Sequence, residues 1–161
     1  MTQALTIRVY RHSDRDDVVE LNAYGLAAAG VPADADAYAG DLDDITTTYL
    51  TGRATMLIGE IDGRVVAMGA LRPLTATTCE ITRMRVHPDA QGRGHGKRML
   101  IALEKRAVHL GYTDAVLLTG PNQHPAIDLY RAAGYTVTAS ENHGPVRGIR
   151  MHKPLAPDAD R

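Results

Sequence analysis

The pattern of apolar and polar residues changes its period several times along the 161-residue chain. Residues 5–11 (LTIRVYR) alternate between apolar and polar, which predicts a strand. A capping-box pair at Ser13 and Asp16 then predicts the start of a helix, and Gly30 predicts its end. The apolar positions at helical spacing between them are Val18, Leu21, Leu26 and Ala28.

The next section of the chain contains an acidic segment and a hairpin. Residues 31–44 are rich in aspartate and turn formers, and they lead into a second short helix around Tyr49. Two apolar segments, TMLIGE and VVAMGAL, flank Asp62 and Gly63, a dipeptide typical of two-residue hairpin turns. We therefore expect two antiparallel strands here, with a third at residues 79–86 (CEITRMRV) beside them.

The second half of the chain alternates helices with strands. Apolar residues recur at helical spacing over residues 99–110, and Gly111 is a natural helix end. Residues 115–120 are apolar throughout, as in a strand covered on both faces. Residues 125–134 predict another helix, and the alternating segments YTVTA and GIRMHKPL predict two final strands. This order predicts an α/β (α+β) fold: a mixed, mostly antiparallel sheet of about seven strands with helices on both faces.

Composition indicates one folded domain, which we place at residues 1–155, followed by a short tail at 156–161. A chain of this length buries roughly two-thirds of its unfolded surface, so it can fold without stabilising disulfides or metal ions. The single cysteine, Cys79, excludes an intramolecular disulfide. We recognise neither a signal peptide nor an apolar run of membrane-spanning length, and we therefore expect a cytoplasmic protein with no membrane partner.

Charge is distributed unevenly along the chain. The net charge is −1, but residues 1–80 carry −6 and residues 81–161 carry +5. A basic second half would suit an anionic ligand, although a solvated surface with segregated charges would give the same numbers.

The most unusual short segment is QGRGHGKRML, residues 91–100, which places three glycines at alternate positions between a strand and a helix. Backbone N–H groups at the start of a helix can hold an anion there. The spacing does not match a dinucleotide-binding fingerprint, because neither Gly92 nor Gly94 has a glycine at the third position of G-x-G-x-x-G. It does not match a P-loop, because Arg98 follows Lys97 where Ser or Thr is needed.

The pattern that fits is Gln-x-x-Gly-x-Gly, formed by Gln91, Gly94 and Gly96 after a strand ending MRVHP. Here the chain resembles the GCN5-related N-acetyltransferases, the GNAT superfamily, over nearly its whole length. The order of elements matches, and so does a downstream pattern of Asn122, Ala126, Leu129, Tyr130, Gly134 and Tyr135. The resemblance implies the GNAT fold, acetyl-CoA as co-substrate, and direct transfer of an acetyl group to a primary amine of a small molecule or peptide.

The resemblance also implies where the cofactor binds. Its pyrophosphate would lie on the glycine loop, whose members are Gln91, Gly92, Arg93, Gly94, His95, Gly96, Lys97 and Arg98. At His95 we expect the backbone N–H to matter more than the ring. The pantetheine arm would pair with the backbone of Met84, Arg85 and Val86, although the side chains of Met84 and Val86 would also suit a core. Asn122 is either a cofactor contact or an ordinary turn residue.

For catalysis the resemblance implies two side chains. Tyr130 would be the general acid near the cofactor sulfur, and its alternative is a core aromatic beside Ile127 and Ala133. Glu80 would accept the ammonium proton, and its alternative is an ion pair with Arg83 or Arg85. By family analogy the backbone N–H of Val86 is the expected oxyanion donor.

Other chemistries and partners are less well supported. Cys79 lies on an apolar strand with no histidine paired to it in the sequence, so we interpret it as a core residue rather than a nucleophile. The histidines lack metal-ligand spacing, and we predict no metal. A non-catalytic acyl-CoA sensor of the same fold is the main alternative function. A nucleic-acid partner is disfavoured by the near-neutral net charge, and members of the family are often homodimers.

The acceptor is the least constrained partner. In this family the segment after the first strand shapes acceptor specificity, and here it is acidic, with Asp34, Asp36, Asp41, Asp43 and Asp44. These carboxylates would attract a cationic acceptor, or they simply form a solvated surface.

Overall fold

The computed structural model describes residues 4–30, 40–120, 123–143 and 146–156. Its strands are β1 Thr6–Val9, β2 Thr55–Ile61, β3 Arg64–Pro73, β4 Thr78–Val86, β5 Asp114–Thr119, β6 Thr136–His143 and β7 Val146–Pro154. Its α-helices are α1 Arg15–Ala29, α2 Ile45–Tyr49, α3 His95–His109 and α4 His124–Ala132, with short 3₁₀ turns η1 His12–Asp14 and η3 Pro88–Ala90.

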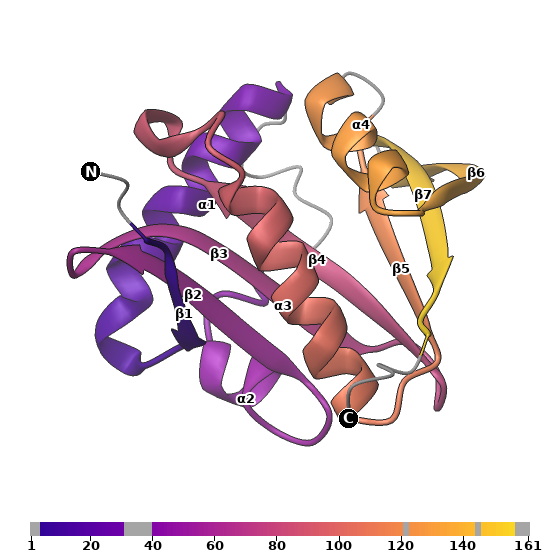
Figure 1. Cartoon of the computed structure of the whole chain (residues 1–161), viewed down its shortest axis with the longest axis horizontal. Coiled ribbons are helices and arrows are strands. Elements are labelled where there is room, and N and C mark those ends of the chain that lie inside the picture. Colours follow the sequence, from indigo (N-terminus) through magenta and orange to yellow (C-terminus); the bar gives the residue numbers. More distant parts are fainter. Residues whose placement is uncertain (1–3, 31–39, 121–122, 144–145, 157–161) are drawn as a thin grey trace.

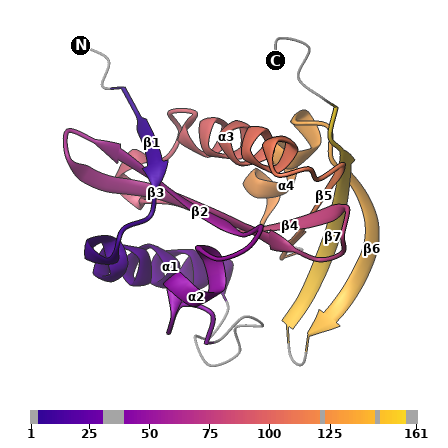
Figure 2. The same cartoon turned by 90° about the horizontal axis from the view of Figure 1, so that it is seen from below.

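The strands form one sheet in the order β1-β2-β3-β4-β5-β7-β6. The pair β4 and β5 is parallel, and the other neighbouring pairs are antiparallel. Helices α1 and α2 cover one face of the sheet, while α3 and α4 cover the other (Figure 2). The structure confirms the predicted mixed sheet of seven strands with helices on both faces. No helix in the described ranges is both long and apolar enough to cross a membrane.

Each face of the sheet has its own apolar core. Under α3 the core includes Met99, Leu100 and Leu103, which recur on the buried side of the helix and are at most 1% exposed. Under α1 and α2 the buried residues include Val18 and Tyr49. The absence of Phe and Trp is met by leucine, methionine and tyrosine on both faces.

The β2–β3 turn forms as its sequence predicts. Asp62 has φ 53° and Gly63 has φ 80°, so both central residues are left-handed, as a two-residue hairpin turn that matches the strand twist requires. This turn lies beside the end of β4, because Ala67 pairs with Val86.

The predicted capping box at Ser13 and Asp16 is wrong. The chain first makes the 3₁₀ turn η1, and Asp14 receives a hydrogen bond from the backbone N–H of Arg11 at 2.8 Å. Asp14 also binds both terminal nitrogens of Arg8, at 2.7 and 2.8 Å, and Arg8 holds the pKa of this carboxyl below its usual value. The bidentate pair with β1 therefore fixes the entry to α1, and Ser13 is exposed.

The feature that positions the site is an opening between β4 and β5. The two strands pair from Thr78 with Asp114 to Ile81 with Leu117, and residues 82–86 continue beside β3 alone. Figure 1 shows β4 and β5 diverging beyond their shared end, with α3 crossing in front and α4 beside β5. The pairing between β4 and β5 therefore stops at Ile81, which leaves a gap in the backbone ladder of the sheet beyond it.

A bulge in β4 accompanies this divergence. Thr82 is opposite Ala70 and Arg85 is opposite Met68, so β4 has one residue more than β3 between these pairs. Arg83 lies in this stretch, with a left-handed φ of 56°. The next residue, Met84, packs against the core under α3, as Ile81 does earlier in the strand. The extra residue thus keeps the apolar side chains of β4 on one face of the sheet.

Candidate active site

The glycine segment forms a loop that leads from the end of β4 into α3. Gly92 has φ 78° and Gly94 has φ 81°, conformations that residues with a side chain rarely adopt. A Cβ built on either would meet no atom within 4 Å, so the space over both is open. Gly96 is closer to its surroundings, since a Cβ there would lie 3.4 Å from Leu129 of α4. The loop thus presents bare backbone at its tip.

The N-terminus of α3 lacks the capping side chain and the acidic residues that are usual at the start of a helix. Its N-cap is Gly94, which makes no side-chain cap hydrogen bond, and its first turn contains no acidic residue. Instead Lys97 and Arg98 lie in that turn, although basic residues there oppose the helix dipole. The N–H groups of His95, Gly96 and Lys97 point out of the helix end, as the first donors of a helix do. Bare donors with added cations form a site that suits an anion.

Gln91 connects this loop to β4. Its side-chain amide donates a hydrogen bond to the carbonyl oxygen of Val86 at 3.1 Å. The backbone N–H of His87 donates to Val66 of β3 at 2.7 Å. Because successive residues of a strand point their N–H and C=O groups to opposite sides, those of Val86 point into the gap rather than at β3. The gap is therefore lined by backbone groups that β5 does not reach.

The ring of His95 is buried, which the sequence did not indicate. His95 is 4% exposed, and within the described residues neither ring nitrogen has a hydrogen-bond partner. It lies four residues before Met99 on the same side of α3, the side that packs on the sheet. Burial lowers the pKa of this histidine, and the positive charges of Arg98 and Arg93 lower it further.

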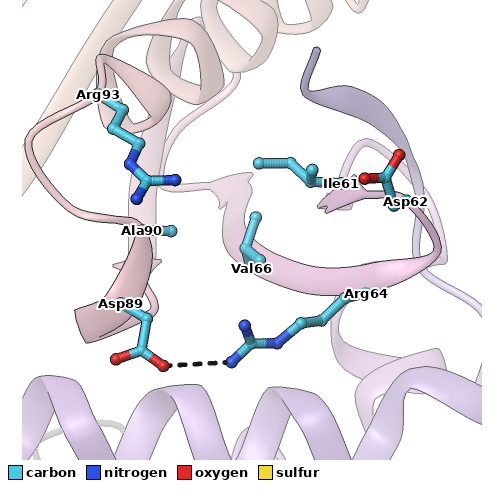
Figure 3. Close-up of a pocket in the computed structure, with 7 residues that line it drawn as sticks. All are labelled: Ile61, Asp62, Arg64, Val66, Asp89, Ala90 and Arg93. Carbon is cyan, nitrogen blue, oxygen red and sulfur yellow. Dashed lines mark ion pairs between the residues drawn. The ribbon is translucent and has the colours of Figure 1, made fainter. Parts of the chain in front are cut away.

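A pocket of about 250 Å³ lies between the glycine loop and the β2–β3 turn (Figure 3). Its buried lining residues are the apolar Ile61, Val66 and Ala90, and the charged residues Asp62, Arg64, Asp89 and Arg93 complete the lining. Arg64 and Asp89 form an ion pair at 3.6 Å, and Figure 3 shows Arg93 extending from the loop toward the pocket. Arg93 thus lies between the glycine loop and the β2–β3 turn, and its charge still acts on His95 in the first turn of α3.

Tyr130 occupies the buried side of α4. It is 7% exposed, belongs to the core under α3, and packs edge-to-face on Tyr135 with ring centroids 6.0 Å apart. Its hydroxyl has no hydrogen-bond partner in the described part of the chain. Burial raises the pKa of Tyr130 to about 12, while the charge of Arg85 acts in the opposite direction. The hydroxyl is therefore protonated at neutral pH and within electrostatic reach of β4.

Glu80 lies on the closed part of β4, where it pairs with Val116 of β5. It is 3% exposed and forms an ion pair with Arg72, its cross-strand neighbour, at 2.9 Å. The sequence suggests Arg83 or Arg85 as its partner, because they are close in the chain. The antiparallel register of β3 against β4 places Arg72 opposite Glu80, a partner that the sequence does not indicate.

Arg83 is held by α1 and by the segment before α2. Its guanidinium binds both oxygens of Asp41, at 2.6 and 2.9 Å, and donates to Asn22 Oδ1 at 2.8 Å. The hydroxyl of Tyr49 donates to the same Asp41 at 2.5 Å. This buried network explains how a strained arginine is kept in place. It also uses Asp41, one of the carboxylates considered for attracting a cationic acceptor.

Arg85 crosses from β4 to the middle of α1. Its side chain lies directly on Gly25, where a Cβ would be 2.2 Å from Cδ and 2.3 Å from Nε of the arginine. Its Nη1 donates to the carbonyl oxygen of Met84 at 3.3 Å, and its Nη2 to Asn22 Oδ1 at 3.4 Å. An isolated glycine inside a helical pattern was the one sequence signal for this contact.

Two other expectations from the sequence can be placed in the structure. Cys79 is fully buried in the core under α3, and burial raises the pKa of its thiol to about 12, which fits the core interpretation. Asp44 caps α2 through the backbone N–H of Thr47, so its carboxylate has a structural role. Asn122, Asp34 and Asp36 lie outside the described residues.

Known proteins share this architecture. A structure from Staphylococcus aureus, described as an acetyltransferase of the GNAT family, superposes with a TM-score of 0.85 at 17% identity, over 95% of this chain and 100% of that one. A Salmonella typhimurium protein assigned as an acetyltransferase, solved with its cofactor acetyl-CoA, has a TM-score of 0.75 at 26% identity, over 97% and 99% of the two chains.

Curated relatives match in sequence over part of their length. The rat protein N-acetyltransferase family 8 member 2 is 33% identical over 103 residues, which are 61% of this chain and 46% of that protein. Mycothiol acetyltransferase from Clavibacter sepedonicus is 27% identical over 136 residues, 84% of this chain and 44% of that protein. The chain thus spans under half the length of these two relatives. The model of the Acetyltransferase (GNAT) family matches residues 27–135, well over half of the chain, and the protein therefore belongs to the GNAT family.

Proposed function

We propose that this protein is an acetyl-CoA-dependent N-acetyltransferase that transfers the acetyl group directly to a primary amine of a small molecule or peptide. One observation carries the proposal: the uncapped, basic start of α3 lies at the end of β4, where β4 has parted from β5. An elongated ligand with an anionic end fits this arrangement. The acetyl-CoA bound to the Salmonella relative, at 26% identity, supports the same ligand here.

The chain offers separate groups for each part of the cofactor. The N–H groups at the start of α3, with Arg93, Lys97 and Arg98, would bind the pyrophosphate. The pantetheine arm would take the place of the missing β5 neighbour and pair with the backbone of Met84, Arg85 and Val86. Bound acetyl-CoA supplies a thioester carbonyl, and the N–H of Val86, which faces the gap, would stabilise the negative charge that develops on it.

Proton transfers would complete the reaction. The neutral amine forms a bond to the carbonyl carbon, and the carbon–sulfur bond breaks. The Tyr130 hydroxyl would donate its proton to the departing thiolate, which suits a phenol kept protonated by burial. Glu80, held by Arg72, is our proposed acceptor for the ammonium proton, directly or through a water.

The cofactor site is tested by Gly94→Glu, measured by calorimetric titration with acetyl-CoA. The new side chain meets open space, so the fold should survive, but a carboxylate at the anion site should abolish binding. Gly52→Glu is the matched control, because Gly52 has φ 60° and equally open surroundings in the turn before β2. Gly52→Glu should suffer the same backbone strain and bind normally. Unchanged affinity in Gly94→Glu would remove the loop from the cofactor site.

The reaction itself is tested by thiol release from acetyl-CoA near pH 8. The amine panel should separate polyamines, aminoglycosides, amino acids and peptides with free N-termini. Release that depends on one class of amine would establish acetyl transfer. Tight acetyl-CoA binding without release for any amine would contradict the enzymatic proposal and favour an acyl-CoA sensor.

A further inference from the structure

The side chains of Arg83 and Arg85 both extend from β4 toward α1, but they are held by different contacts. Arg83 has its guanidinium against both oxygens of Asp41, and its side chain is 2% exposed. The charge of Arg83 is therefore balanced inside the protein, and its contacts hold the bulge of β4 in place. Arg85, two residues later, is partly exposed and lies on the backbone of α1 at Gly25.

The position of Arg85 relative to the reacting groups is specific. It directly precedes Val86, whose N–H we assign to the thioester carbonyl, and its charge reaches the Tyr130 hydroxyl. Because strand residues alternate, the side chain of Arg85 points to the α1 side while Met84 and Val86 pack toward α3. The glycine loop begins α3, so Arg85 lies on the opposite face of the sheet from the proposed pyrophosphate site.

The contact with Gly25 fixes where the guanidinium lies. Any side chain at position 25 would overlap Cδ and Nε of Arg85, so the absence of a Cβ creates the space that the arginine occupies. A glycine in a helix interior costs about 1 kcal/mol relative to alanine. Helix α1 is therefore intrinsically less stable at position 25, where the side chain of Arg85 crosses it.

We propose that Arg85 binds a carboxylate on the acceptor, so that the amine acetylated by this protein belongs to an amino acid. This inference rests on the proposed function and names its substrate class. A planar guanidinium matches a carboxylate through two parallel hydrogen bonds, which also fixes the direction of the bound molecule. With the carboxylate at Arg85, an amine a few bonds away lies beside the residue that positions the thioester.

The neighbouring charges agree with an anionic acceptor group. Asp41 is engaged by Arg83 and Tyr49, and Asp44 caps α2. These two carboxylates of the segment after β1 therefore have partners within the fold, and the charge of Asp41 is balanced by Arg83.

The test compares amino acids with their carboxamides, which keep the amine and lose the negative charge. Acceptor binding to the protein saturated with coenzyme A is measured by calorimetry, and turnover is measured by thiol release. Wild type should prefer the carboxylate. Arg85→Gln should lower binding and kcat/KM for amino acids about ten- to hundredfold, with acetyl-CoA affinity unchanged. Arg85→Lys should recover only part of this loss.

A second variant, at Gly25, moves the Arg85 side chain without replacing it. Gly25→Ala should displace the arginine and reduce the preference for carboxylates, while the helix is not weakened, because the overlapping atoms belong to a flexible side chain. Arg131→Gln, at an exposed arginine of α4, is the control and should behave as wild type.

The outcomes separate the two proposals. Equal use of amino acids and carboxamides, or a preference that persists in both Arg85→Gln and Gly25→Ala, would overturn the carboxylate site and leave the acetyltransferase intact. Amino acids that bind wild type but not Arg85→Gln, with no thiol released, would keep the site and refute the enzyme. Absence of amino acid binding to wild type would overturn the carboxylate site.

Discussion

The two ends of β4 show how one strand can serve both stability and chemistry. From Thr78 to Ile81 it has neighbours on both sides, its apolar residues are buried, and Glu80 is paired across the sheet with Arg72. From Thr82 to Val86 it has β3 alone beside it. The closed end holds the sheet together, whereas the open end leaves backbone groups for a ligand. The bulge at Arg83 marks the change between them.

The largest effect on stability should come from the closed end. Arg72→Leu leaves the buried carboxylate of Glu80 without its cross-strand partner, and we expect a loss of about 2–3 kcal/mol in the free energy of unfolding. The value is at the low end for buried pairs because the Arg72 side chain is 32% exposed. Urea denaturation measures it. Arg64→Leu, in the exposed pair with Asp89, should cost less than about 1 kcal/mol, and equal costs for the two variants would contradict the distinction.

The largest effect on turnover should come from the open end. Tyr130→Phe removes the hydroxyl that we assign as general acid, so kcat at saturating acetyl-CoA should fall roughly a hundredfold. Acetyl-CoA affinity and the urea midpoint should change little, because the ring and its packing on Tyr135 remain. A variant with full turnover would leave Tyr130 as a packing residue.

A change at the bulge should affect both ends. In Gly69→Ala the new Cβ would lie 2.7 Å from Leu103 Cδ1 and 2.8 Å from Met84 Sδ, which predicts a loss of about 1–3 kcal/mol in stability. Because Met84 must move, acetyl-CoA affinity should fall as well. Gly59→Ala on β2 is similarly tight, at 3.0 Å from Leu5, and serves as the control. It should lose stability with normal cofactor affinity, so a Gly69→Ala variant with unchanged affinity would separate the bulge from the site.

The smallest effect should be a change in pH dependence at the glycine loop. The folded protein keeps the pKa of His95 below its usual value, so the unfolded chain takes up a proton first as the pH falls. Stability from this residue is therefore present above about pH 6.5 and is lost below it. Urea midpoints from pH 8 to pH 5 should decline more steeply for wild type than for His95→Met. Parallel declines would show that His95 does not titrate differently on folding.

Local signals allowed most of the fold to be predicted. The Asp62–Gly63 turn, the helix ends at Gly30 and Gly134, and the glycine loop all depend on neighbouring residues in the sequence. The missed features depend on distant residues. Asp14 replaces Ser13 at the start of α1 because Arg8 of β1 reaches it, and no spacing within the helix shows that contact.

The candidate site divides in the same way. The loop and the position of Tyr130 follow from contiguous patterns, so the sequence indicated them. The ion pair of Glu80 with Arg72 depends on the register of β3 against β4. The packing of Arg85 on Gly25 depends on how α1 crosses the sheet. Both require the tertiary arrangement, which periodicity alone does not supply.

The short parallel pairing of β4 with β5 has a consequence for the order of folding. Strands β2, β3 and β4 are joined by turns, and β6 and β7 form a hairpin, so each group can assemble from nearby contacts. Strand β5 lies between the two groups, beside β7 and β4, and its pairing with β4 covers only the stretch from Thr78 to Ile81. We expect this pairing to form last and to open first. In native-state hydrogen exchange, the amides of β5 should therefore lose protection before those of β3.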